Sequence, residues 1–152
     1  MKLLVSVVDA GEAREAAAAG ADIVDVKNPA EGSLGAPAPA VIASVRAAVP
    51  ARLPVSAAIG DMPDLPGTAA LAALGAASSG ATFVKVGLWG VSTEDDAVRL
   101  LRAVREGVAN VPGAVVVAAA YADARRVPYA PRVSPSGRIP AREPDPLGQR
   151  SP

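Results

Sequence analysis

Short apolar segments alternate with alanine-rich helical segments along the first 119 residues, and this alternation constrains the fold more than any other feature. It predicts strands over residues 3–8, 23–26, 54–59, 82–86 and 114–119. It predicts helices over residues 12–19, 38–48, 68–78 and 93–107. Strands that are apolar on both faces and separated by helices pair in parallel, with the helices covering the sheet.

The ends of the predicted strands differ between odd and even strands. The odd strands lead to Asp9, Asp61 and Asp123, whereas the two clear even strands end in Lys27 and Lys85. A repeat of two βα units fits a (β/α)8 barrel, whose interior layers alternate between odd and even strands. We therefore predict an α/β fold, a partial (β/α)8 TIM-type barrel of about five βα units. A doubly wound open sheet is the alternative, but no Gly-x-Gly-x-x-Gly motif follows any strand.

The chain changes character at residue 128. Residues 128–152 hold seven of the fifteen prolines, several arginines and no apolar periodicity. Proline has no amide hydrogen and interrupts both helices and central strands. We expect a partial barrel over residues 1–127 and a disordered tail over 128–152. Our hypothesis for this tail is a frameshifted end on a truncated enzyme, since a closed barrel needs about 250 residues.

Charge and missing residue types exclude several classes of function. The fifteen basic and fifteen acidic residues balance, which argues against nucleic acid or a membrane surface as a partner. No cysteine or histidine is present, so thiolate nucleophiles, sulfur-ligated zinc and histidine acid–base catalysis are excluded. We expect no metal and no cofactor. The N-terminal apolar run is too short for a signal peptide, and we expect a cytoplasmic protein.

Two of the three lysines occur at matched positions, in a chain that otherwise uses twelve arginines. Lysine differs from arginine in that its amine can lose a proton, attack a carbonyl and form an imine. Asp25 and Lys27 are two residues apart and share a strand face, and Lys85 ends the next even strand. We predict that Asp25, Lys27 and Lys85 form a catalytic site at the carboxyl ends of the strands. An ordinary ion pair of Asp25 with either lysine is an equally weighted alternative.

The loop after Lys27 contains a second group of candidate residues. Asn28, Ser33 and Gly35 precede a predicted helix, where backbone amides can bind a phosphate, although such glycines often only form turns. Asp123 is expected on the same rim. We interpret Asp61 as a helix cap, and Ser92 with Asp95 as a capping box for the following helix.

Three segments resemble the (5-formylfuran-3-yl)methyl phosphate synthase family of methanofuran-type cofactor biosynthesis. They are LLVSVVDAGEAREAAAAGADIVDVKNPAEGSLGA, VSAAIGDMPDLPGTAALAALGAASSGATFVKVGLWG and VVVAAAYADA. The motif DVKNPxEGSLGA is specific, and the resemblance extends from about residue 1 to residue 125. It implies a (β/α)8 barrel in a lyase that uses no metal or organic cofactor.

The resemblance also implies a reaction and the roles of three residues. Two molecules of glyceraldehyde 3-phosphate are joined into 4-(hydroxymethyl)-2-furancarboxaldehyde phosphate, with loss of water and one phosphate. Lys27 matches the lysine that forms the Schiff base, Lys85 the proton acceptor, and Asp25 an assisting aspartate. Asn28, Ser33, Gly35 and Asp123 are the candidate substrate-binding residues.

The sequence departs from the family after residue 127, where the family continues with three further βα units. Two alternatives therefore stay open. One is a non-catalytic partial barrel that pairs with a second copy or another chain, and the other is a different class I aldolase acting on a phosphorylated sugar. In each catalytic case the expected partner is a small phosphorylated aldehyde, and a homo-oligomer is a possible assembly.

Overall fold

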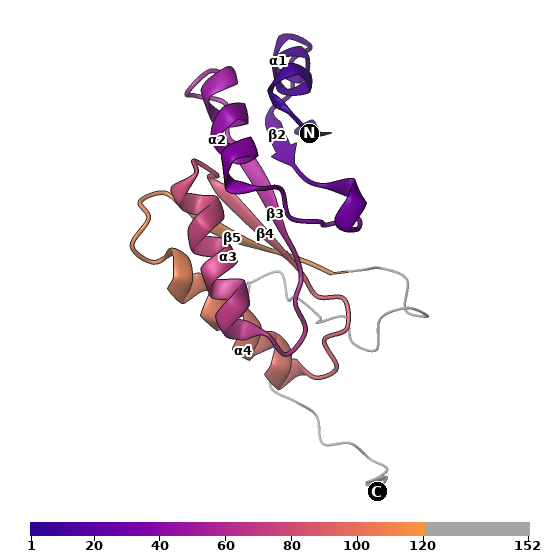
Figure 1. Ribbon diagram of the computed structural model, residues 1–152, viewed down its shortest axis with the longest axis vertical. Coiled ribbons are helices and arrows are strands. Elements are labelled where there is room, and N and C mark those ends of the chain that lie inside the picture. The colour runs from indigo at the N-terminus through magenta and orange to yellow at the C-terminus, as the bar shows by residue number, and fades with distance from the viewer. Residues whose placement is uncertain (121–152) are drawn as a thin grey trace, which may run out of the picture.

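The computed structural model describes residues 1–120 and contains every predicted strand and helix, with ends within two residues of the prediction (Figure 1). The strands are β1 (Leu4–Val7), β2 (Ile23–Val26), β3 (Val55–Asp61), β4 (Phe83–Gly87) and β5 (Val115–Ala119). The helices are α1 (Ala10–Ala18), α2 (Pro39–Ala48), α3 (Pro66–Ser78) and α4 (Glu94–Val108). A short 3₁₀ helix, η1 (Pro29–Glu31), was not predicted. The predicted boundary at residue 127, the tail over 128–152 and Asp123 lie outside the described residues.

The five described strands form one parallel sheet in the order β1-β2-β3-β4-β5. A doubly wound sheet changes direction within its strand order, whereas this order is sequential throughout. The helices follow one another along the sheet in chain order (Figure 1). The predicted partial (β/α)8 barrel is therefore confirmed, and the doubly wound alternative is wrong.

Alternation of side chains gives the sheet two different faces. The helices pack on the outer face, which carries the two apolar cores. The strand residues in these cores are Val7, Val24, Val26, Val55, Ala57, Ile59, Val84 and Val86. The opposite face, called the inner face below, carries the intervening residues, including Asp25 and Lys85. Because helix packing uses only the outer face, polar side chains can occupy the inner one.

Helices α3 and α4 make the closest helix–helix contact in the described part of the chain. A Cβ atom added at Gly107 of α4 would lie 2.5 Å from the carbonyl oxygen of Ala70 in α3. That distance is too short for real carbon and oxygen atoms, so only glycine allows the two backbones to approach in this way. Helices α3 and α4 together cover the outer face of β3 and β4.

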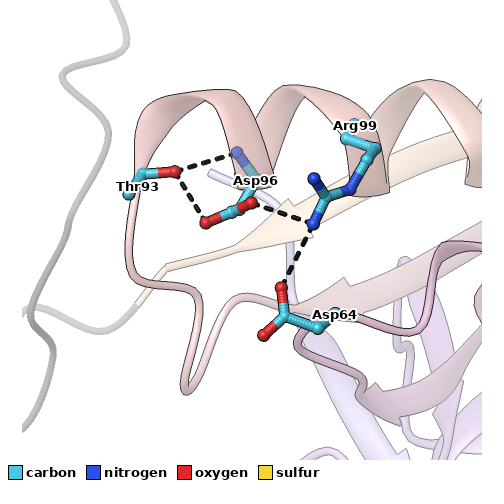
Figure 2. A network of polar contacts seen from close by, with 4 residues as sticks. All are labelled: Asp64, Thr93, Asp96 and Arg99. Carbon is cyan, nitrogen blue, oxygen red and sulfur yellow. Dashed lines mark hydrogen bonds and ion pairs between the residues drawn. The ribbon is translucent and has the colours of Figure 1, made fainter.

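Two helices begin at side-chain caps, and one predicted cap is shifted. The Asp9 carboxylate accepts hydrogen bonds from the amides of Gly11 and Glu12 at the start of α1. At α4 the cap is Thr93 rather than Ser92. Thr93 Oγ1 accepts from the Asp96 amide at 3.1 Å and donates to the Asp96 carboxylate at 2.6 Å, as Figure 2 shows. The cap therefore lies one residue later than predicted, and the Asp96 carboxylate bonds the Thr93 hydroxyl group rather than the Thr93 amide of a full capping box.

Asp61 caps no helix, contrary to our interpretation of the sequence. The N-cap of α3 is Leu65, and no side chain forms a capping hydrogen bond there. Asp61 is instead the last residue of β3, and its carboxylate accepts a hydrogen bond from the Trp89 amide at 3.0 Å. This aspartate connects two loops rather than starting a helix.

Arg46 stabilises the turn before β3, at the amino-terminal end of that strand. Its guanidinium donates hydrogen bonds to the carbonyl oxygens of Leu53, Val49 and Pro50, just before β3 begins. Gly80, which precedes β4, packs against the Arg46 stem so closely that a Cβ atom there would lie 2.6 Å from Cγ. One arginine therefore satisfies the carbonyl groups of the turn between α2 and β3.

Gly107→Ala is expected to destabilise the fold, although alanine is the better helix former. The new methyl group would meet backbone atoms of Ala70, and such overpacking costs about 1–3 kcal/mol. Gly75→Ala in α3 is the matched control, because open space surrounds that position, and it should stabilise by up to about 1 kcal/mol. Urea denaturation followed by circular dichroism measures both. Equal stabilisation by the two substitutions would contradict the described helix contact.

Candidate active site

A buried ion pair joins strands β2 and β4. Asp25 is 1% exposed, and its Oδ2 atom lies 2.6 Å from Lys85 Nζ, whose side chain is 17% exposed. A carboxylate that has lost its water needs such a charged hydrogen-bond donor. The structure therefore brings together two of the three predicted catalytic residues.

Strand β3 lies between these two residues, so the Lys85 side chain must cross it to reach Asp25. Asp25 is paired with Ser56 in the sheet, and Lys85 with Ala58. Both residues of β3 are small and almost fully buried, at 3% and 0% exposure. A larger side chain at either position would obstruct the lysine stem. The small residues of β3 are thus part of the site, and neither was among the predicted residues.

Lys27 lies on the same face as Lys85 and at the same level. Its amide donates to the Val7 carbonyl, which continues the sheet one residue beyond β2. The pairing of Val26 with Ala57 places Lys27 beside Ala58, and Ala58 is paired with Lys85. Two strand spacings separate the Cα atoms of the two lysines, about 10 Å. Within residues 1–120, Lys85 forms an ion pair with Asp25, whereas Lys27 forms none.

Ser6 adds a second hydrogen-bond donor to the Asp25 carboxylate. Its hydroxyl group lies 3.3 Å from Oδ2, and the two residues are paired between β1 and β2. The other carboxylate oxygen, Oδ1, is buried and has no hydrogen-bond partner in the described structure. Buried carboxylate oxygens normally have a partner, so Oδ1 is an available acceptor for a hydroxyl group. Polar residues within apolar strands were the sequence signal for Ser6 and Ser56.

The loop after Lys27 is closed by its own hydrogen bonds. The Asn28 amide donates to the Gly35 carbonyl, and the Gly35 amide donates to the Gly32 carbonyl. The Asn28 side chain caps η1 and donates to the Glu31 carboxylate. A Cβ atom at Gly35 would lie 2.1 Å from the Asn28 carbonyl oxygen, so this position requires glycine. Asn28 and Gly35 therefore hold the shape of the loop. Ser33 is exposed on it, and substrate binding by these residues stays a prediction.

Residues 1–120 contain neither a cluster of side chains suited to a metal ion nor a helix suited to a bilayer. No three acidic side chains gather in a way that would hold a metal ion. None of the four described α-helices combines the length and apolar character that a bilayer crossing requires.

A family model described as 4-HFC-P synthase matches residues 3–142 of the chain. The chain belongs to the 4-HFC-P synthase family. The family resemblance predicted from the motif around Lys27 is therefore confirmed.

Curated members of this family are similar over most of the chain. The (5-formylfuran-3-yl)methyl phosphate synthase of Methanothermobacter thermautotrophicus is 54% identical over 127 residues, which cover 84% of this chain and 54% of that protein. The enzyme of the same name from Methanocaldococcus jannaschii is 55% identical over 128 residues, with the same coverage. That of Methanosarcina mazei is 54% identical, covering 84% and 55%. The chain spans about half the length of these relatives.

Solved structures resemble the fold. Two crystal forms of 2,3-dimethylmalate lyase, a member of the PEP mutase/isocitrate lyase superfamily, superpose with TM-scores of 0.66 and 0.64. Each is 19% identical to this chain; the alignments cover 84% and 83% of it and 50% and 49% of the lyase. At this identity the similarity concerns the fold alone.

Asp25→Ala is expected to destabilise the protein by about 3–5 kcal/mol, because it leaves a largely buried ammonium group without its partner. Asp25→Ala combined with Lys85→Met should cost less than the sum of the two single substitutions. Arg99→Ala is the control, since it removes exposed ion pairs worth less than about 1 kcal/mol. Additive effects at Asp25 and Lys85 in urea denaturation would contradict the pairing.

Proposed function

We propose that this chain carries the Schiff-base site of a (5-formylfuran-3-yl)methyl phosphate synthase. The substrate is glyceraldehyde 3-phosphate, and two molecules give 4-(hydroxymethyl)-2-furancarboxaldehyde phosphate with loss of water and one phosphate. Family membership supports the reaction. The assignment of residues rests on one observation. Lys27 and Lys85 lie level with each other on the inner face, and of the two only Lys85 is ion-paired with Asp25 within residues 1–120.

Lys27 is the proposed nucleophile. Its amine attacks the aldehyde carbon of the first triose phosphate, and loss of water leaves an imine. The protonated imine withdraws electrons from the adjacent carbon, which makes its C–H bond acidic. The absence of an ion pair to Lys27 within residues 1–120 supports this role, because a paired ammonium group would first have to leave its carboxylate.

Lys85 is the proposed proton acceptor, and Asp25 assists it. Lys85 lies level with Lys27, two strands away, and is therefore within side-chain reach of a substrate bound at Lys27. The Lys85 ammonium first passes one proton to the Asp25 carboxylate along the 2.6 Å contact, and the neutral amine then takes the proton from carbon. The resulting enamine carbon attacks the second aldehyde, and the proton returns during loss of water. Asp25 Oδ1 is an acceptor for a hydroxyl group of the bound triose.

The substrate phosphates have two proposed partners in the described residues. Asn28 and Ser33 lie in the closed loop directly after Lys27, and Gly35 fixes the shape of that loop. The loop's internal hydrogen bonds use the amides of residues 28, 30, 31, 32 and 35 and the side chain of Asn28. In this proposal a bound phosphate exchanges some of these bonds for its own. Asp123, which lies outside the described residues, is a further proposed substrate-binding residue. The proposed activity needs no metal and no organic cofactor.

Borohydride trapping tests the proposed imine. Reduction in the presence of glyceraldehyde 3-phosphate should leave a stable adduct on Lys27, detected by peptide mass spectrometry. Lys27→Ala should abolish the adduct, whereas Lys2→Ala, which changes an exposed lysine outside the site, should leave it unchanged. Lys85→Ala should keep the adduct and lose the furan product. Trapping at Lys2 or Lys85, or at no lysine, would reject the assignment, and product analysis separates it from another class I aldolase.

Self-association is a second proposal, and the inner face supports it. Leu4, Val115 and Val117 lie on this face at the two outermost strands of the described sheet and are 36–47% exposed. Exposed apolar residues beside an unpaired strand favour pairing with another chain.

Analytical ultracentrifugation at micromolar concentration measures the oligomeric state of the chain. We expect a homo-oligomer, and Val117→Lys should shift it toward the monomer because a charge would then face the partner. A folded monomer of the unmodified chain would reject both self-association and the non-catalytic alternative that depends on it.

A further inference from the structure

A β-bulge near the end of β3 turns Asp61 toward the site. Ala58 is paired with Lys85 and Asp61 with Gly87, so three residues of β3 match two residues of β4. Gly60, within this bulge, has a φ of 92°, a left-handed conformation that glycine adopts without strain. Without the bulge, strict alternation would place Asp61 on the outer face with Ile59. Bulges beside functional sites often redirect a side chain in this way.

The Asp61 carboxylate occupies the space above Gly87. A Cβ atom added at Gly87 would lie 1.8 Å from Asp61 Oδ1 and 2.8 Å from a methyl group of Leu34. The same Oδ1 atom accepts the hydrogen bond from the Trp89 amide at 3.0 Å. The loop after β2, the end of β3 and the loop after β4 therefore meet at Gly87. One carboxylate fastens the end of β4 to the end of β3.

The fastened strand end carries Lys85. Gly87 follows Lys85 by two residues, so both face the inner side, and the Asp61 carboxylate lies along the same column. Lys85 reaches Asp25 only by extending across β3, so its Nζ position depends on how β4 lies against β3. A small rotation of the β4 end would move Nζ away from the carboxylate.

We propose that Asp61 is a positioning residue that holds Lys85 on Asp25 by binding the Trp89 amide above Gly87. The inference deepens the proposed function, because Lys85 is the proposed proton acceptor. Asp61 acts through its hydrogen bond with the Trp89 amide and through the contact of its carboxylate with Gly87.

Acetylation of lysines tests the proposal without any substrate. The chain is treated with limiting acetic anhydride across a range of pH, and mass spectrometry gives the ratio of acetylation at Lys85 to that at Lys27. Asp61→Ala should raise this ratio several-fold, because Lys85 is released from Asp25. Gly87→Ala should do the same, since its methyl group displaces the carboxylate. Asp61→Asn should keep the ratio of the unmodified chain, because its side-chain oxygen still accepts the Trp89 N–H.

Asp64→Ala is the matched control. Asp64 lies three residues further along the same loop, where its exposed carboxylate pairs with Arg99 of α4 (Figure 2), and its removal should leave the ratio unchanged. An equal rise at both lysines in Asp61→Ala would indicate general loosening and would overturn the proposal. So would an unchanged ratio, or an Asp61→Asn variant that behaves like Asp61→Ala.

Hydrogen exchange provides a measurement on the unmodified chain if the alanine variants do not fold. The Trp89 amide should exchange more slowly than the Gly90 amide, and Asp61→Asn should retain that protection. Unprotected Trp89 would overturn the proposal. Because neither acetylation nor exchange requires an imine, failure of borohydride trapping would reject the proposed function and leave the role of Asp61 standing.

Discussion

Parallel pairing with alternating side chains is the constraint on which the rest of this structure depends. In a parallel sheet, paired residues face the same side, and the connecting helices here cover one side only. The apolar contacts that stabilise the fold are therefore concentrated on the outer face. Within residues 1–120 no helix packs on the inner face, where a carboxylate, two lysines and two serines lie in adjoining rows. The proposed site and the apolar cores thus use the same five strands without competing for the same positions.

The contact between Asp25 and Lys85 gives this arrangement its chemical character. Because it spans an intervening strand, it requires small residues at Ser56 and Ala58 as much as it requires the charged pair. It also makes the two lysines different. One is held by a carboxylate, and the other lies in the same row without such a partner among the described residues. The proposed division of roles between nucleophile and proton acceptor rests on that asymmetry.

The sequence contained enough information to predict the strands, the helices and the face shared by Asp25, Lys27 and Lys85, because all three follow from periodicity. It did not contain enough to choose between the two possible ion pairs, since either lysine lies within reach of Asp25. The cap of α4 was misplaced because Ser92 with Asp95 and Thr93 with Asp96 satisfy the same pattern. Asp61 was assigned to a helix cap because an extra residue in β3 breaks the alternation on which strand predictions rest. The left-handed conformation of Gly60 allows this bulge and so determines which face Asp61 occupies. Hydrophobic periodicity does not predict such a conformation.

Arg46 has a consequence for how such a protein can change over evolutionary time. It binds three carbonyl groups of the turn before β3, at the opposite end of that strand from Asp61. Substitutions in the loops at the carboxyl ends of the strands leave these hydrogen bonds in place, because the three carbonyl groups belong to the turn between α2 and β3. Changes at that end of the sheet are therefore expected to alter the proposed site without removing the Arg46 anchor at the other end.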